Sequence, residues 1–182
     1  VPILIPEPHD DLDSLIRAIE KFAASGRPYI ADPILDPIHF GFTESVMRYR
    51  ELSRRVPGAE ILMGIANLTE LTDADTTGIT AVIMGVVSEL GINNVLVVQE
   101  SPHARRAVKE ADLAWRIMFA AREAGGLPVG VHPGLMCLRD RSPFPNTPDE
   151  IAEMAAMIKD QEVLARDRVR YVGQPIALVA AE

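Results

Sequence analysis

The feature that most constrains this chain is a fourfold alternation of short apolar runs with longer stretches of helical periodicity. The apolar runs are residues 1–6, 28–35, 60–66 and 94–99. The helical stretches are residues 10–26, 43–58, 73–91 and 101–126. Strands that are apolar throughout and alternate with helices are typical of a parallel sheet covered by helices. The alternation therefore predicts an α/β fold.

The spacing of the units narrows the architecture. The strand starts lie about 30 residues apart, which is the length of one βα unit. Four tandem units fit an open doubly wound sheet or half of a (β/α)8 TIM barrel, which needs about 250 residues when complete. The chain has 182 residues, and its four units end near residue 126. We expect residues 1–126 to form a half-barrel, and because the chain begins at Val1 we expect it to be a piece of a longer protein.

A half-barrel has consequences for association. It leaves strand edges and an apolar face uncovered, and both favour contact with another chain. We therefore expect a homodimer, or pairing with another half-barrel.

The alternation of strands and helices ends after residue 126, and the composition of the chain changes. Residues 127–160 read as a proline-rich loop followed by a short helix over 148–160, and we assign them to the first domain. Residues 161–182 form a tail of uncertain origin in which two apolar segments flank Gly-Gln-Pro. That pattern predicts a short β-hairpin.

Composition excludes several classes of protein. The formal net charge is −8, and no basic stripe of the kind that binds nucleic acid stands out. Cys137 is the single cysteine, so neither a disulfide framework nor a cysteine zinc site is expected. No apolar run reaches 18 residues, and no secretory leader pattern begins the chain. We expect a cytoplasmic protein that binds neither nucleic acid nor membrane.

Polar residues follow each predicted strand. Ligands of parallel α/β folds bind at the carboxyl ends of the strands, so these residues should converge on one rim. In chain order they are Glu7, His9, Asp10; Asp36, His39, Gly41; Asn67, Thr69, Glu70; Gln99, Glu100, Ser101 and His103. No Ser-His-Asp or Cys-His nucleophile set can be argued, and no catalytic residue is assigned.

Two carboxylates in the second apolar run need an explanation. If the strand continues through residue 36, alternation puts Asp32 and Asp36 on one face, about 13 Å apart, with Asp36 at the rim. A buried carboxylate must be paired or hydrogen-bonded. The structural interpretation is that backbone groups or an arginine satisfy Asp32 and that Asp36 caps a loop. The functional interpretation makes Asp36 a ligand-binding acid.

Two further clusters have competing interpretations. Thr72 or Asp73 can cap the third helix, and acids suit its positive end. Alternatively, Glu70, Asp73 and Asp75 supply hard oxygen ligands to an ion such as Mg²⁺.

At the fourth helix, Ser101 and the proline after it look like an ordinary helix start. His103 and Arg106 would then lie in the first turn, where they could contact an anionic substrate group.

Four stretches of the chain resemble a known family. They are DPILDPIHFGF, LMGIANLTELTDADTTG, NNVLVVQESPHARRAVKEAD and PFPNTPDEIAEMAAMIKD. Over about residues 1–160 the chain closely resembles the dihydropteroate synthase-related proteins of methanogens and methylotrophs, which belong to the pterin-binding TIM-barrel superfamily. The resemblance implies strands five to eight of such a barrel. It also implies a reduced pterin as ligand or substrate, in folate or tetrahydromethanopterin-type one-carbon metabolism.

The motifs match that family in part. Asp36-Pro37 and Gly41-Phe42 resemble the motif whose aspartate reads the pterin ring, with one extra residue between them. Ala66-Asn67-Leu68 stand where the synthase has Ser-Arg-Lys, and Val97-Val98-Gln99 replace its Arg-x-His. We expect a pterin-binding, transferase-like protein without competent synthase activity, in which no metal is needed.

The resemblance and the rim together assign the site. The residues expected to contact a substrate are Asp36, His39, Asn67, Glu70, Gln99, His103 and Arg106. Structural or secondary roles are expected for Asp32, Asp73 and Asp75.

The tail has a resemblance of its own, and the sequence also allows two other functions. Residues 163–182 resemble a segment of the molybdenum-binding subunit of xanthine dehydrogenases and aldehyde oxidases, without any of its active-site motifs, and no molybdenum chemistry is inferred. The alternative functions are a non-catalytic half-barrel assembly module and a metal-dependent hydrolase that uses Glu70, Asp73 and Asp75.

Overall fold

A computed structural model describes residues 1–136 and the two short segments 169–171 and 178–180. The chain divides into two compact units, Val1–Cys137 and Leu138–Glu182. The predicted helix over 148–160, the turn between the tail strands and Cys137 lie outside the described residues.

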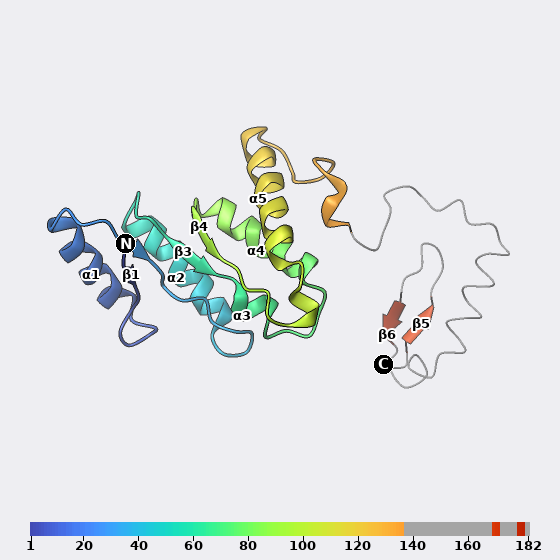
Figure 1. Ribbon diagram of the computed structural model, residues 1–182, viewed down its shortest axis with the longest axis horizontal. Coiled ribbons are helices and arrows are strands. Elements are labelled where there is room, and N and C mark those ends of the chain that lie inside the picture. Colours follow the sequence, from blue (N-terminus) through green and yellow to red (C-terminus); the bar gives the residue numbers. More distant parts are fainter. Residues whose placement is uncertain (137–168, 172–177, 181–182) are drawn as a thin grey trace. The chain divides into compact units, whose positions relative to one another are not determined.

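The first unit contains the four predicted strand–helix pairs (Figure 1). Its strands are β1 (Ile3–Leu4), β2 (Ile30–Ala31), β3 (Leu62–Gly64) and β4 (Asn94–Leu96). Its α-helices are α1 (Leu12–Ala24), α2 (Phe42–Arg55), α3 (Ala66–Thr69), α4 (Thr76–Glu89) and α5 (Ala107–Glu123). The 3-10 turns are η1 (Pro102–Ala104) and η2 (Pro133–Leu135). The predicted α/β alternation is confirmed.

The strands are parallel and follow chain order. β1 pairs with β2, placing Ile3 opposite Ile30, and β3 pairs with β4, placing Leu62 opposite Asn94. A single parallel bridge between Ala31 and Ile61 links the two pairs. Within the described residues the strands form two parallel pairs and do not close into a barrel.

One face of these strands packs on the helices and the other is open. Ala31, Ile61 and Met63 point to the helical side and are buried in a core shared with α1, α2, α4 and α5. On the opposite face Ile3, Ile5 and Leu96 are each about half exposed. The apolar composition of the first run, residues 1–6, would suit a strand buried on both faces, but its odd-numbered residues are exposed because nothing among the described residues covers that face.

Capping residues and glycines mark the ends of several helices. Asp11 caps α1 by accepting a hydrogen bond from the Ser14 N–H. Gly26, Gly91 and Gly125 follow α1, α4 and α5 with positive φ, a conformation that glycine adopts at little cost.

Three predicted boundaries are wrong. β2 ends at Ala31, and Ile34 has a φ of 65°, so residues 32–36 are not extended. The N-cap of α4 is Asp75, which makes no side-chain capping bond, so neither Thr72 nor Asp73 caps this helix. α5 begins at Ala107, because residues 102–104 form the separate 3-10 turn η1.

The second unit is described only by its two strands. β5 (Val169–Tyr171) and β6 (Leu178–Ala180) pair in antiparallel fashion, placing Val169 opposite Ala180. The predicted strand–strand pattern of the tail is confirmed. Within the described residues, no helix is both long enough and apolar enough to cross a bilayer.

Candidate functional site

The loops that follow the four strands contact one another in chain order. His9, after β1, places Nε2 4.0 Å from Asp36 Oδ1, after β2. Asn67 donates its side-chain N–H to the Leu35 carbonyl at 2.6 Å, which joins the second loop to the third. His103 Nε2 lies 3.0 Å from the Thr69 carbonyl, which joins the third to the fourth. The loops therefore share one rim, the position where parallel α/β folds bind ligands.

Asp36 is the most constrained carboxylate of this rim. Arg48 of α2 donates a hydrogen bond to its Oδ2 at 2.7 Å, and both side chains are almost fully buried. The same guanidinium donates to the carbonyls of Pro33 and Ile34, at 3.2 and 2.9 Å. Arg48 thus ties the irregular segment after β2 to the helix that follows it.

Gly41 is required beside this carboxylate. It has a φ of 108°, and a Cβ at this position would lie 3.2 Å from Asp36 Oδ2. Ser45 accepts a 3.0 Å hydrogen bond from the Asp36 N–H and donates its hydroxyl to the Phe42 carbonyl. The glycine therefore makes room for the aspartate.

Asp32 has a different environment. Its Oδ1 accepts hydrogen bonds from the Tyr49 hydroxyl at 2.7 Å and from the Ile34 N–H at 2.8 Å. Burial raises the pKa of Asp32, and the two hydrogen bonds oppose that shift. Burial and the neighbouring Asp32 charge raise the pKa of Tyr49 as well. Asp32 is an internal carboxylate that a backbone N–H group satisfies, as one of the two expected alternatives had it, and its side-chain partner is a tyrosine and not an arginine.

Glu70 fastens the third loop to the fourth. Its carboxylate accepts hydrogen bonds from the backbone N–H groups of Glu100 and Ser101, both at 2.9 Å. Hydrogen bonds from the Ser101 side chain and from these N–H groups lower the pKa of Glu70. In this arrangement the Glu70 carboxylate occupies the backbone N–H groups of the loop after β4, as a bound anion would.

The remaining predicted site residues are spread along the rim. His39 is exposed and has a positive φ of 69°. Gln99 accepts a 3.0 Å hydrogen bond from the Val108 N–H in the first turn of α5. Arg106 precedes α5, with its Nε 4.0 Å from Glu110. Arg106 is therefore engaged with the protein in this conformation.

The three acids of the metal interpretation do not come together. Asp73 and Asp75 are exposed, while Glu70 is bonded to backbone amides. In the part of the chain that the structure describes, no three His, Cys, Asp or Glu side chains are grouped as metal ligands.

Sequence reasoning missed the helical partners of the buried carboxylates. Tyr49 lies on the buried face of α2 with Ser45 and Leu52, at spacings of four and three residues. Glu110 lies likewise on the buried face of α5 and accepts hydrogen bonds from Thr76 at 2.6 Å and Thr77 at 2.8 Å. A polar residue at helical spacing within an apolar face is the signal that could have found them.

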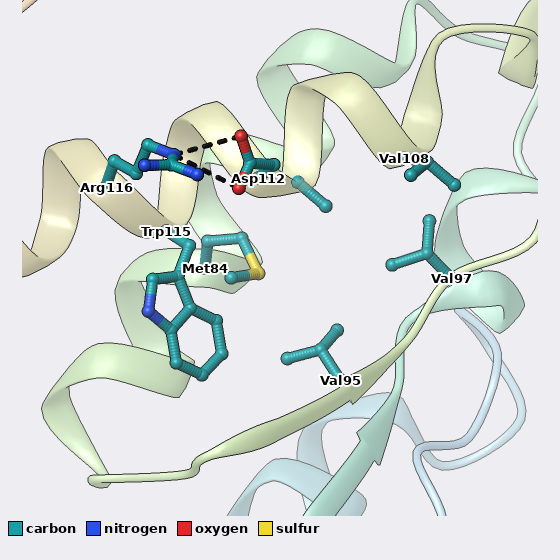
Figure 2. A pocket seen from close by; sticks show the side chains of 8 residues that line it. Met84, Val95, Val97, Val108, Asp112, Trp115 and Arg116 are labelled. Carbon is teal, nitrogen blue, oxygen red and sulfur yellow. Dashed lines mark hydrogen bonds and ion pairs between the residues drawn. The ribbon is translucent and has the colours of Figure 1, made fainter.

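An apolar groove of about 480 Å³ lies between β4 and α5 (Figure 2). Val95 and Val97 point from the strand toward Met84 and Trp115 on the helices, and the Asp112–Arg116 ion pair lies at one side. The lining residues are Met84, Val95, Val97, Val108, Ala111, Asp112, Trp115 and Arg116. This apolar lining distinguishes the groove from the polar rim.

The fold and the contacts between the loops define the chain as a parallel α/β protein whose loops share a polar rim. An archaeal protein, the uncharacterized protein MJ0107 of Methanocaldococcus jannaschii, is 32% identical over 134 residues. The match covers 71% of this chain and 25% of the archaeal protein, so the chain spans about a quarter of that relative's length. No protein-family model and no solved structure matches the chain.

Proposed function

We propose that this chain is half of a (β/α)8-type domain that binds a reduced pterin at the rim formed by its four strand–helix loops. The observation that carries the proposal is the fixed position of Asp36. Its carboxylate lies at the rim and is held by Arg48 through Oδ2, while Oδ1 faces His9 at 4.0 Å, longer than a hydrogen bond. Asp36 is thus a rigid acceptor with one oxygen directed to another rim loop.

The chemistry of a pterin suits such an acceptor. The aminopyrimidinone edge offers parallel N–H donors, as a guanidinium does, and carboxylates bind such donors strongly. In the structure Arg48 fills part of this role. We therefore infer that Arg48 orients the carboxylate and that a ligand N–H approaches Oδ1 from the side of His9.

Neighbouring loops supply the other proposed contacts. Asn67 is positioned by its bond to the Leu35 carbonyl and keeps its side-chain oxygen for a ligand donor. His103 and Arg106 lie on the loop after β4 and supply the contacts to an anionic substituent. The resemblance to dihydropteroate synthase-related proteins supports a transferase role in one-carbon metabolism for the larger domain.

Calorimetric titration with a tetrahydropterin tests the proposal. We expect the unmodified chain to bind it and Asp36→Asn to lose binding, because the amide has only one acceptor oxygen. Asp73→Asn is the matched control, since it removes the same charge from an exposed position. Circular dichroism of each variant separates loss of binding from loss of folding. Equal affinity of Asp36→Asn and the unmodified chain would end the assignment.

A second candidate function is an assembly module without a ligand. It is favoured by the row of half-exposed apolar side chains on the open face of the strands, Ile3, Ile5 and Leu96. Exposed apolar rows of this kind mark interaction surfaces. A chain that self-associates and binds no pterin would support this function over the first.

A further inference from the structure

In each parallel pair, the strand that comes earlier in the chain bonds its neighbour through residues whose side chains lie on the helical side. In the first pair the carbonyls of Pro2 and Leu4 accept from the N–H groups of Ile30 and Asp32, at 3.0 and 2.8 Å. The earlier strand thus bonds through its even-numbered residues, and Leu4 packs against the core on the helical side. In a parallel ladder such bonds come from alternate residues, so Ile3 and Ile5 direct their backbone groups away from β2.

The second pair repeats the rule. The Asn94 N–H donates to the Ile61 carbonyl at 3.3 Å, and the Ile65 N–H donates to the Leu96 carbonyl at 3.0 Å. The earlier strand again uses residues whose side chains lie in the helix-covered core, here Ile61 and Ile65. The later strand uses residues of the open face, here Asn94 and Leu96.

The two outer edges fit the same rule. β4 has Val95 and Val97 left to bond a following strand, and both side chains lie on the helical side, in the groove beside Trp115. β1 has Ile3 and Ile5 left to bond a preceding strand, and both side chains lie on the open face. The alternation in the two ladders directs the backbone N–H and C=O groups of these four residues away from β2 and β3, toward the outer edges. A strand β1 placed after β4 would therefore continue the existing bonding pattern.

The prolines beside β1 leave this edge usable. Pro2 and Pro6 lack an N–H group, but both belong to the even-numbered set that faces β2. The outward set, Ile3 and Ile5, retains its N–H donors. An edge protected against pairing would instead carry proline or charge in the outward set.

We propose that a second copy of this chain occupies the groove and edge of β4 with its own β1. A two-fold axis parallel to the strands makes this junction twice and closes eight parallel strands, the number in a (β/α)8 barrel. Leu4 of the second copy then lies on the helical side next to Val95 and Val97, beneath α5. The open-face residues Ile3, Ile5 and Leu96 become interior. This inference rests on the half-barrel part of the proposed function.

The test is the mass in solution of the full 182-residue chain without ligand. Trp115 lines the groove and is the single tryptophan of the sequence, so its fluorescence reports on occupancy of the groove. We expect sedimentation to give twice the 19.9 kDa chain mass. Dilution should lower the mass and shift the Trp115 emission to the red with the same midpoint.

Paired variants locate the interface. Leu96→Lys puts a charge on the open face, where a closed barrel would bury it, and we expect the dimer dissociation constant to rise more than about 100-fold. Val82→Lys on α4 is the matched control, because Val82 is also exposed but lies outside the proposed junction. Ile3→Pro removes one outward N–H and should weaken the dimer without breaking the β1–β2 ladder.

Each outcome decides the proposal. A chain that stays monomeric at all concentrations, or a dimer unaffected by Leu96→Lys, overturns it. A monomer that associates only with a different half-barrel chain overturns the choice of a second copy. The result is separate from pterin binding: a ligand-free dimer without pterin affinity would remove the pterin proposal and keep this one.

Discussion

Arg48 donates a 2.7 Å hydrogen bond to Asp36 across an interface where the two side chains are only 11% and 10% exposed. An isolated charge in such a place would be costly, because desolvation penalises an ion that has no partner. The ion pair is therefore a condition for placing a carboxylate at the base of this rim.

Replacing Arg48 should destabilise the fold strongly. Arg48→Met leaves Asp36 buried without its cation and frees the carbonyls of Pro33 and Ile34, so we expect a loss of about 3–5 kcal/mol. Arg50→Met on the exposed side of the same helix should change stability by less than about 0.5 kcal/mol. Urea denaturation of both variants measures the difference. Similar small losses in both would show that the Asp36–Arg48 pair contributes little.

Tyr49, the residue after Arg48 in α2, donates a hydrogen bond to the second carboxylate, Asp32. We expect Tyr49→Phe to cost about 1.5–3 kcal/mol, because the Asp32 carboxylate loses a buried donor at 2.7 Å. The double variant with Asp32→Asn should lose less than the sum of the single losses, since the two groups act as a pair. Strict additivity in the four-member cycle would contradict a direct energetic coupling between Tyr49 and Asp32.

The elements were predictable because the signals that specify them are local. Apolar runs, helical spacing and the glycines after α1, α4 and α5 lie within each unit, so the strand–helix order follows from the sequence. The end of β2 was not predictable from alternation. Pro33 and the left-handed Ile34 turn the chain directly after Asp32, and the groups that stabilise this turn are on α2.

The candidate site was predictable in position but not in detail. The rim follows from parallel topology, and its loops do contact one another through pairs such as Asn67 with Leu35. The backbone partner expected for Asp32 is present, but the arginine that was its expected alternative lies on Asp36, and the tyrosine on Asp32 was not foreseen. Arg48 and Tyr49 are adjacent in sequence, and only the rotation of α2 relative to the loop decides which carboxylate each one reaches.

Two carboxylates should give stability opposite dependences on pH. The pKa of Asp32 is raised above 3.8, so the folded state keeps its proton longer, and this contribution falls as pH rises from 3.8 through the folded pKa. The pKa of Glu70 is lowered below 4.5, so its contribution is present above 4.5 and is lost as pH falls through the folded pKa. The two contributions therefore have opposite signs in acid.

Neutral variants separate the two effects. Asp32→Asn should remove the decline with rising pH, and Glu70→Gln should remove the loss on acidification. Unfolding free energies from urea titrations between about pH 3 and pH 7 measure both slopes. Parallel pH profiles for the two variants would contradict the assigned directions.

Two threonines one turn apart on α4 should respond oppositely to the same substitution. Thr80 is fully buried, and its Oγ1 has no hydrogen-bond partner among the described residues, so it carries the desolvation cost of a hydroxyl without compensation. Thr76 donates its hydroxyl to Glu110 at 2.6 Å, and that carboxylate is 5% exposed. Valine has the shape of threonine and a similar helix propensity, so the hydroxyl is the main difference.

We therefore expect Thr80→Val to stabilise the chain by about 1 kcal/mol and Thr76→Val to destabilise it by about 1.5–3 kcal/mol. The second loss is larger because a buried carboxylate is left with fewer donors. Each variant is the control for the other, since helix, residue type and volume change are shared. The measurement is the urea midpoint at constant m-value. Equal destabilisation by both would mean that packing, and not the hydroxyl's partner, decides the effect at these positions.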